Sequence, residues 1–442
     1  MVAISARPAH HNSGPTPPRR PPKDPSVTES AAVPHPHPRL LVLSACAGLV
    51  LCMIGVFAFA ALLPTFMRDW DLSNTEAGWI GGILFAGYAV AAPVLVSLTD
   101  RLDARRVFVA GAVVAAGANL AFALFAEGFW SALALRALAG VGLAGTYMPG
   151  LRVMVDRIAP ARRAGAVPLY TASFSLGSAL SYLVPALVAE AAGWPGAFVV
   201  SGAAALLAAG TVAWMAPHAP DQPADPRTRG ALLDFRPVLA SRAAMGYILG
   251  YVAHMWELFA FRAWVVAVLG FALVADAGPW GAAAGGPGSL LEPGAVASWG
   301  ALVAMACSIG GARLATRLGR ARTTQAYMVL SAVTALGFGW LAGGLSYPLV
   351  AGLAILYAGL IQLDSAALTT GAVETAPAGR RGATLALHSL LGFGAAFLGP
   401  VAFGIVLDLA GGRESTAAWG LAFGLVGLVG LAGVPALRRA RA

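Results

Sequence analysis

The chain has 442 residues, of which 58% are hydrophobic and 11% are charged, and its mean hydropathy is +0.74. A chain of this composition cannot keep its whole surface in water, which excludes an ordinary soluble protein and predicts a protein of the lipid bilayer. The net charge of +9 is compatible with nucleic-acid binding, but the positions of the basic residues, described below, argue against it.

Residues 1–40 are rich in proline, with scattered charges and histidines. This composition predicts a disordered cytoplasmic tail, whose histidines we expect to be solvated rather than bound to metal. The stretch 43-LSAC-46 resembles a lipoprotein cleavage box, but no apolar segment precedes Cys46. We therefore expect no cleaved signal peptide.

After the tail come about twelve nearly uncharged runs of about 18 residues or more, each long enough to cross a bilayer. Glycine and alanine dominate these runs, which favours closely packed helices over β-strands. We therefore predict an all-α integral membrane protein with about twelve transmembrane helices in two six-helix pseudo-symmetric halves. The predicted spans are 41–66, 76–98, 107–126, 130–151, 166–189, 196–216, 243–270, 295–312, 324–343, 347–370, 383–407 and 415–436.

The basic residues are distributed unevenly between the two sides of the predicted membrane. If the N-terminus is cytoplasmic, all but four of the 29 Lys and Arg residues lie on cytoplasmic segments. The exceptions are Arg68 and Arg413 in outer loops and Arg136 and Arg262 inside spans. This distribution is typical of the positive-inside rule. It predicts a multi-pass protein of the cell (inner) membrane with both termini cytoplasmic and no nucleic-acid partner.

A polar interruption separates the first six spans from the last six, and similar loops occur in both sets. The loop 100-DRLDARR-106 matches 316-TRLGRAR-322 at an offset of 216, and 159-APARRAGA-166 matches 376-APAGRRGA-383 at 217 to 218. Such a repeat predicts two bundles related by an axis along the membrane normal. The predicted divisions are a tail (1–40), an N-terminal bundle (41–216), a linker (217–241), a C-terminal bundle (242–437) and a basic cytoplasmic C-terminus (438–442).

The two basic loops resemble a signature of the major facilitator superfamily of secondary transporters, G-x-L-x-D-R-x-G-R-R, which lies between helices 2 and 3 and recurs between helices 8 and 9. Val96 and Asp103 stand where the family has glycines, and Thr316 replaces the acid of the second copy. The resemblance covers residues of about 40–437 and implies a transporter. The matching residues are Leu98, Asp100, Arg101, Arg105 and Arg106 in the first copy and Arg317, Gly319, Arg320 and Arg322 in the second.

By this resemblance, the basic loops form a cytoplasmic gate that must open when the protein faces inward. A short turn rich in arginine pairs with carboxylates and with the negative C-terminal end of a helix. We expect Asp156 to pair with Arg101 or Arg105; the alternative is that the arginines only fix the topology. The predicted gate residues are Asp100, Arg101, Arg105, Arg106, Asp156, Arg317 and Arg320.

Six ionisable residues lie inside predicted spans, where each costs about 2.5–3.5 kcal/mol on insertion scales. They fall in spans 4, 7, 10 and 11, whereas spans 3, 6, 9 and 12 carry none away from their ends. In the family that the chain resembles, helices 1, 4, 7 and 10 line the central cavity. We therefore predict a role in substrate binding or proton coupling for Arg136, His254, Glu257, Arg262, Asp364 and His388.

The stretch 251-YVAHMWELFAFRAW-264 holds three of these residues. His254 and Glu257 share one helix face, where a buried carboxyl group and an imidazole could take up and release a proton. The alternatives are a structural polar cluster or direct ligand contact. We expect no metal site, because no third ligand is evident. We expect Arg262 to pair with another helix or to reach the outer surface.

Each of the other three residues keeps two interpretations. Arg136, in 135-LRALAGVGLAG-145, resembles a helix 4 pattern that the family links to proton coupling, or else it binds an anionic substrate. Asp364 binds substrate or pairs with a group of helix 4 or helix 11. His388 is functional or structural.

The function predicted from these features is transport of a small solute by alternating access, coupled to protons. The alternative is a facilitative or anion carrier without proton coupling, in which Arg136 and Arg262 bind the substrate. We predict no enzymatic activity, because no H-E-x-x-H or nucleophile motif occurs. No cofactor is expected. The predicted partners are a small-molecule substrate, protons and the lipid bilayer, and the protein is expected to be a monomer. The substrate and the direction of transport stay open.

Overall fold

The computed structural model describes residues 37–218, 234–276 and 289–439. These residues form α-helices, and no strand occurs among them. Most of the predicted tail, much of the predicted linker and the last three residues lie outside the described part of the chain. The fold class predicted from the sequence is confirmed.

The N-terminal half supplies six crossings. Pro160–Met215 is one helix of 56 residues by its hydrogen bonds, but it turns at Gly193, where φ is 67° and only glycine is unstrained, so it crosses twice. The predicted span 41–66 is not one continuous helix, because residues 54–57 break it. The helices of this half are α1 (Pro38–Met53), α2 (Ala58–Ala61), α3 (Leu63–Asp69), α4 (Asn74–Leu98), α5 (Ala104–Phe125), α6 (Phe129–Val155) and α7 (Pro160–Met215).

The C-terminal half also supplies six crossings, and one of them is interrupted as well. The crossing formed by α13 and α14 is broken at Leu363 and Asp364. The helices of this half are α8 (Arg236–Ala240), α9 (Arg242–Ala275), α11 (Pro293–Leu318), α12 (Arg320–Leu341), α13 (Tyr347–Gln362), α14 (Ser365–Glu374), α15 (Arg381–Leu409) and α16 (Thr416–Arg439).

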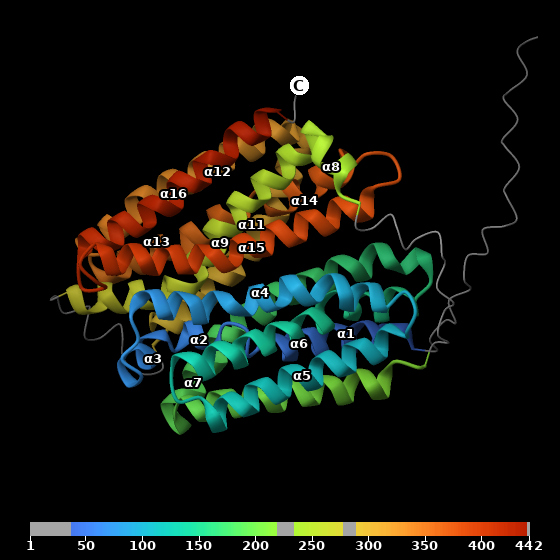
Figure 1. Ribbon diagram of the computed structural model, residues 1–442, viewed down its shortest axis with the longest axis horizontal. Helices are drawn as coiled ribbons and strands as arrows, with labels where there is room; N and C mark the ends of the chain where they lie inside the picture. Colours follow the sequence, from blue (N-terminus) through green and yellow to red (C-terminus); the bar gives the residue numbers. More distant parts are fainter. Residues whose placement is uncertain (1–36, 219–233, 277–288, 440–442) are drawn as a thin grey trace, which may run out of the picture.

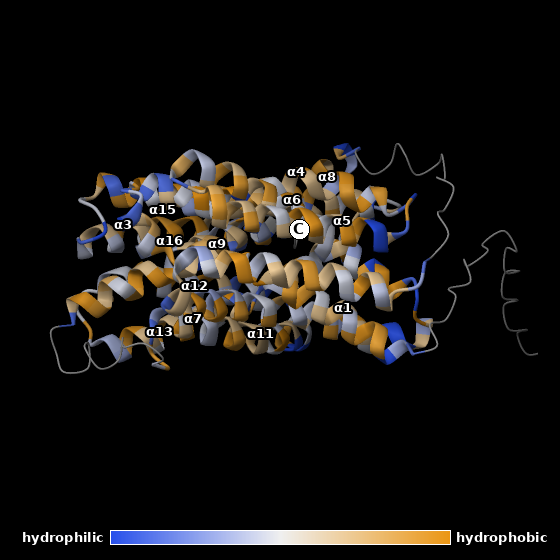
Figure 2. Ribbon diagram, turned by 90° about the horizontal axis from the view of Figure 1, so that it is seen from below, coloured by the Kyte–Doolittle hydropathy of each residue, from blue (hydrophilic) through white to orange (hydrophobic). Residues whose placement is uncertain are grey.

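The surface of these helices fits a bilayer. Within the described residues, nine helices are long and apolar enough to cross a membrane by themselves, when α13 and α14 are taken together. One of the nine, α7, crosses twice, and the interrupted first crossing and α12 complete the twelve. Large apolar side chains such as Val90 (77% exposed) and Trp214 (85% exposed) point away from the protein. Figure 2 shows hydrophobic residues along the helices and hydrophilic residues gathered toward their ends. The protein is therefore a multi-pass membrane protein.

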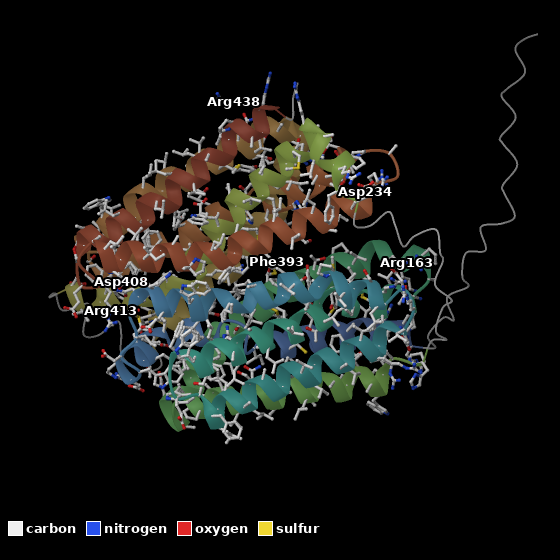
Figure 3. All side chains as sticks on the ribbon, in the orientation of Figure 1. Arg163, Asp234, Phe393, Asp408, Arg413 and Arg438 are labelled. Carbon is white, nitrogen blue, oxygen red and sulfur yellow. The ribbon has the colours of Figure 1, made fainter. Side chains whose placement is uncertain are left out.

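The two halves form two bundles that meet at one end (Figure 1). We call this end, which holds α3 and Asp408, the α3 end; we call the opposite end, which holds Arg163 and Asp234, the basic end (Figure 3). The bundles lie together at the α3 end and diverge toward the basic end. The main contacts between them join α4 to α15 and α7 to α11.

Asp408 of α15 joins the two bundles at the α3 end by capping the N-terminus of α4. Its carboxylate accepts hydrogen bonds from the backbone and side chain of Asn74 (3.1 and 2.7 Å) and of Thr75 (2.8 and 2.6 Å). An acid at a helix N-terminus satisfies free N–H groups and matches the helix dipole. This contact closes the α3 end in the structure.

Glycines allow the same two helices to approach closely. A Cβ atom on Gly404 of α15 would lie 2.2 Å from the backbone oxygen of Asn74, and one on Gly78 of α4 would lie 2.4 Å from that of Pro400. Small residues at such positions let helix backbones touch. The close approach that the glycine-rich sequence of α15 predicts is found at Gly404, whereas Gly394 has open space around it.

We expect Gly404→Leu to open the α3 end. Overpacking between α15 and α4 costs about 1–3 kcal/mol in the closed arrangement. The equilibrium between the closed and the separated arrangement therefore shifts toward the separated one by about 5- to 150-fold. The measurement is the distance between spin labels at Glu127 and Arg413, two exposed residues of different halves, in a cysteine-free background. Gly394→Leu on the same helix is the control and should keep the wild-type distance. Identical distance distributions for Gly404→Leu and wild type would contradict the expectation.

Candidate functional site

The break in the first crossing is held in place by side chains of two other helices. The guanidinium of Arg136 on α6 donates to the backbone oxygens of Gly55 (2.8 Å) and Val56. The backbone N–H of Phe57 donates to Ser181 Oγ on α7 at 2.6 Å. Arg136, only 2% exposed, thus supplies donors for carbonyls that a continuous helix would have satisfied itself. Sequence reasoning placed Arg136 in the membrane but missed this role.

Aromatic rings from both halves surround the break. Phe57 stacks on Tyr182 of α7 at 5.1 Å, and Phe85 of α4 meets Phe259 of α9 at 4.2 Å. Figure 3 places Phe393 between the two bundles. We call this group the aromatic cluster; its members are Phe57, Phe85, Tyr88, Tyr182, Phe259 and Phe393. The sequence does not identify this cluster, since a ring inside an apolar run gives no distinguishing signal.

Arg262 of α9 lies over the aromatic cluster as a buried cation. Its guanidinium carbon is 5.3 Å from the ring centre of Phe57 and 5.6 Å from that of Phe259, and the residue is 7% exposed. In the described part of the chain, no carboxylate lies within ion-pair distance of it. The alternative of reaching the surface is therefore wrong, and Arg262 meets the first crossing through the ring of Phe57 rather than through an acid. Cation–π contacts stabilise the guanidinium in place of an acid.

A small cavity of about 20 Å³ adjoins Arg262, between α7, α9, α11 and α13, and Tyr182 and Leu258 also line it. The hydroxyl of Tyr182 donates to the backbone oxygen of Arg262 at 2.6 Å, which fixes α9 against α7 across the interface between the halves. A cavity of this size holds about one water molecule. A larger ligand would therefore need the bundles to move apart here.

His254 and Asp364 form a buried pair between α9 and the break in the tenth crossing. His254 Nδ1 lies 2.7 Å from Asp364 Oδ1, and the two residues are 2% and 3% exposed. The imidazole N–H does not point along the line to the carboxylate oxygen, so the contact is a short polar contact rather than an aligned hydrogen bond. The prediction that Asp364 pairs with the fourth or the eleventh crossing is wrong, because its partner lies on α9, which is the seventh crossing.

Glu257 points into the C-terminal bundle. Its carboxylate accepts hydrogen bonds from the Tyr357 hydroxyl of α13 (2.9 Å) and from Ser331 Oγ of α12 (3.1 Å). Glu257 also lies three residues after His254 on α9. His254 and Glu257 therefore share a region of α9 as expected, but His254 pairs with an acid whereas Glu257 is held by hydroxyl groups.

His388 of α15 extends this set of polar groups toward the interface between the halves. Its ring stacks on Tyr251 of α9 with centres 3.7 Å apart, and its Nε2 is 3.4 Å from Thr369 Oγ1. Tyr251 also lies 5.8 Å from the ring of His254. The buried polar chain, as we call it, runs through Glu257, Asp364, His254, Tyr251 and His388. Five of the six predicted intramembrane residues thus lie on α9 or contact it; Arg136 is apart.

At the basic end, the predicted gate residues form ion pairs within each half. Arg152 contacts Asp100 and lies 3.4 Å from Asp156. The predicted pairing of Asp156 with Arg101 or Arg105 is therefore wrong: a residue one helical turn away on α6 holds this acid instead. In the other half Arg320 pairs with Glu374. Among the described residues, no ion pair joins the two halves at this end.

Asp103 contacts the predicted gate residue Arg105, although the sequence did not place Asp103 among the predicted gate residues. It caps α5 by accepting from the backbone N–H of Arg105 (3.0 Å), and it forms a buried ion pair with Arg157 at 2.5 Å. It had been noted only as a departure from the expected glycine. Arg105 itself contacts His218 and the backbone oxygen of Ala213. The other predicted gate residues, Arg101, Arg106 and Arg317, are exposed.

A sequence model of the Major Facilitator Superfamily matches residues 45–400. The chain is 33% identical over 153 residues to the niacin transporter NiaP of Acinetobacter baylyi (34% of each chain). It is 24% identical to protein spinster homolog 3 of Danio rerio (57% of this chain, 52% of that protein) and 24% identical to a benzoate transport protein of Acinetobacter baylyi (38% and 36%). The matches thus span between about a third and a half of these relatives' length.

The fold is similar to that of solved structures. A bacterial homolog to the human lysosomal transporter Spinster, crystallised in an inward-facing and unoccupied conformation, superposes with a TM-score of 0.69 at 17% identity, covering 92% of this chain and 95% of that one. At this identity the likeness concerns the fold alone.

Proposed function

Because the chain belongs to the Major Facilitator Superfamily, we propose that it is a proton-coupled transporter that carries a small organic carboxylate across the membrane by alternating access. Family membership makes it a transporter of small molecules. The coupling to protons, the substrate class, the inner-membrane location with cytoplasmic termini and the monomeric state are our proposals, as is the absence of enzymatic activity.

The observation that carries the proposal is the buried pair of His254 and Asp364. A pair of ionisable groups inside the membrane is costly and is retained where a charge must change or move. His254 Nε2 makes no hydrogen bond with any described residue, so the ring has an unused site for a proton. The buried polar chain leads from this pair toward His388, close to the interface between the halves. Protonation of the Asp364 carboxylate itself would remove its charge and weaken its contact with His254.

Arg262 supports a carboxylate as the substrate. Its guanidinium has no acid partner among the described residues and lies against the rings of Phe57 and Phe259. A planar aromatic acid offers both a carboxylate for the guanidinium and a ring for the aromatic cluster. Relatives are named as transporters of niacin, benzoate and 4-hydroxybenzoate, which are all aromatic carboxylates.

The arrangement of the bundles supports alternating access. Asp408 closes the α3 end, while the basic end has ion pairs only within each half, as far as the described residues extend. We take this as an inward-facing arrangement, in which the gate residues of the two halves are separated. In the outward-facing state, the Asp408 contact breaks and the basic loops approach each other.

The proposal is tested by thermal stabilisation of the purified protein with benzoate, nicotinate and their neutral amides at roughly pH 5.5 and 8. We expect the acids to stabilise the protein, with a dependence on pH, and the amides to have no effect. Equal stabilisation by an acid at both pH values would favour the second candidate, an anion carrier without proton coupling, for which the unpaired Arg262 is the supporting observation. Stabilisation by neither acid would refute the substrate class.

A further inference from the structure

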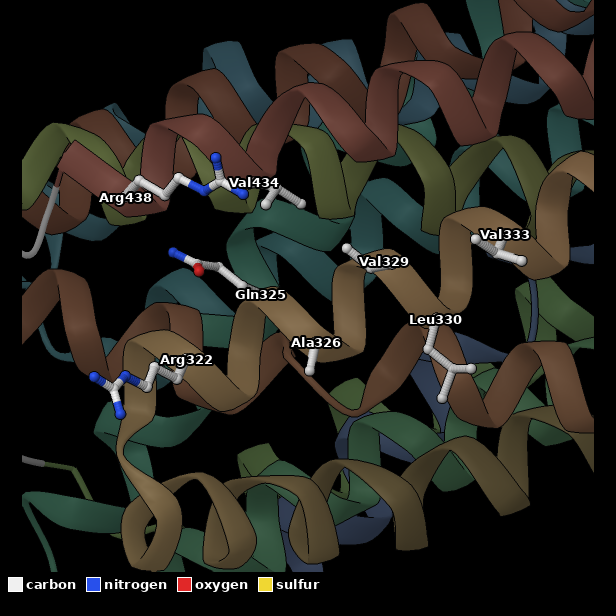
Figure 4. A pocket seen from close by; sticks show the side chains of 8 residues that line it. All are labelled: Arg322, Gln325, Ala326, Val329, Leu330, Val333, Val434 and Arg438. Carbon is white, nitrogen blue, oxygen red and sulfur yellow. The ribbon is translucent and has the colours of Figure 1, made fainter.

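A groove lies on the outer surface of the C-terminal bundle, between α12 and α16, near their basic end. Its volume is about 680 Å³. Figure 4 shows Arg322 and Arg438 at one end of the groove and Leu330 and Val333 toward the other. None of these residues belongs to the aromatic cluster or the buried polar chain, so the groove is separate from the candidate transport site.

One face of α12 forms an apolar wall along this groove. Ala326, Val329, Leu330 and Val333 are exposed and follow one another at helical spacing. At a rise of about 1.5 Å per residue, Arg322 and Val333 are about 16 Å apart along the axis. Half of a hydrocarbon core of about 30 Å is nearly the same length. The groove therefore runs from the headgroup level to about the middle of the bilayer.

The charged end of the groove is electrostatically incomplete. Arg322 and Arg438 come from two facing helices and are both exposed. Among the described residues neither has a carboxylate within ion-pair distance, whereas Arg320, two positions before Arg322, is paired with Glu374. Guanidinium groups bind phosphate through charge-assisted hydrogen bonds, so two of them at one end of the groove favour an anionic headgroup.

We propose that this groove binds one anionic phospholipid from the membrane leaflet at the basic end. Its phosphate contacts Arg322 and Arg438, and one acyl chain lies along Ala326, Val329, Leu330 and Val333. Charge complementarity selects this occupant: the phosphate of a zwitterionic lipid is offset by the cation of its own headgroup, and a second copy of this basic chain adds no net negative charge. Anionic lipids are concentrated in the cytoplasmic leaflet, which is where the positive-inside rule places the basic end. The bound lipid would link the ends of α12 and α16.

The test is native mass spectrometry of the full-length protein titrated with phosphatidylglycerol or with phosphatidylcholine of the same acyl chains. We expect wild type to retain one phosphatidylglycerol at least about tenfold more tightly than phosphatidylcholine. The double variant Arg322→Gln and Arg438→Gln should lose this preference. Ala326→Trp, which fills the apolar part of the groove, should weaken the binding of both lipids.

Arg313→Gln is the matched control, since Arg313 is an exposed arginine on α11 outside the groove, and it should behave as wild type. All substituted residues are exposed, so the melting temperature without added lipid should not change, which serves as the check on folding. Equal retention of the two lipids by wild type, an unchanged preference in the double variant, or a dimer that replaces the lipid-bound monomer would overturn the proposal.

Discussion

Replacing Asp364 with asparagine should abolish substrate accumulation driven by a pH gradient while leaving substrate exchange intact. A transporter that couples one proton to one substrate can accumulate the substrate up to about 100-fold against a gradient of two pH units, since each unit is equivalent to about 1.4 kcal/mol. The amide side chain of the variant cannot carry a charge or bind a proton. The accumulation ratio should therefore fall to about one. The measurement uses proteoliposomes preloaded at one pH and diluted into another, with gradients of both signs.

Exchange of labelled for unlabelled substrate at equal pH is the check on folding, because exchange needs the conformational change but no net proton movement. Asp69→Asn is the matched control: Asp69 is a more exposed acid that pairs with Arg68 at the α3 end, so its loss should change neither readout. If Asp364→Asn still accumulates substrate like wild type, the His254 and Asp364 pair is not the coupling site. Glu257, which is held by Tyr357 and Ser331, would then be the next residue to replace.

Arg262→Gln should weaken the binding of an aromatic carboxylate by about 10- to 150-fold and at the same time stabilise the ligand-free protein. A hydrogen bond to a charged group contributes about 1.5–3 kcal/mol, which gives the loss in affinity. The gain in stability follows because the wild-type guanidinium is buried against Phe57 and Phe259 without an acid partner among the described residues. Both quantities come from one thermal-shift titration with benzoate.

The opposite signs of these two effects separate a binding role from a structural one. A structural Arg262 would lower the melting temperature on replacement and leave the shift caused by the ligand unchanged. Arg68→Gln is the control, because its side chain is 73% exposed, and it should affect neither quantity. Benzoate affinity equal to wild type in Arg262→Gln would remove Arg262 from the proposed substrate site.

The membrane fold and the family were predictable from the sequence because their signals are local or repeated. Apolar runs must match the thickness of a bilayer, and basic loops must remain on one side of it. The repeat of 100-DRLDARR-106 at 316-TRLGRAR-322 indicated the two halves and the resemblance to the superfamily. The family is confirmed by the match over residues 45–400, and the helical membrane fold by the helices of the described residues. The exact divisions of the chain and the roles of the site residues stay predictions.

The partners of the buried charges could not be predicted in the same way. Helical periodicity shows that His254 and Glu257 share a face, but it does not show which neighbouring helix each of them meets. The sequence therefore left Asp364 without its true partner and assigned Asp156 the wrong one. Arg136 was missed as a support of the break after α1, since backbone carbonyls become available only where a helix is interrupted.

What the sequence alone determined is that this chain crosses a membrane about twelve times, in two related halves, with ionisable groups at a few intramembrane positions. Hydrophobic length and charge asymmetry are properties of each segment by itself, so no neighbour is needed to read them. What only the tertiary structure decided is how those groups are combined: Asp364 against His254, Arg262 over Phe57, and Asp408 on the N-terminus of α4. These contacts join residues far apart in the chain, and the rotation and crossing of packed helices determine which of them meet.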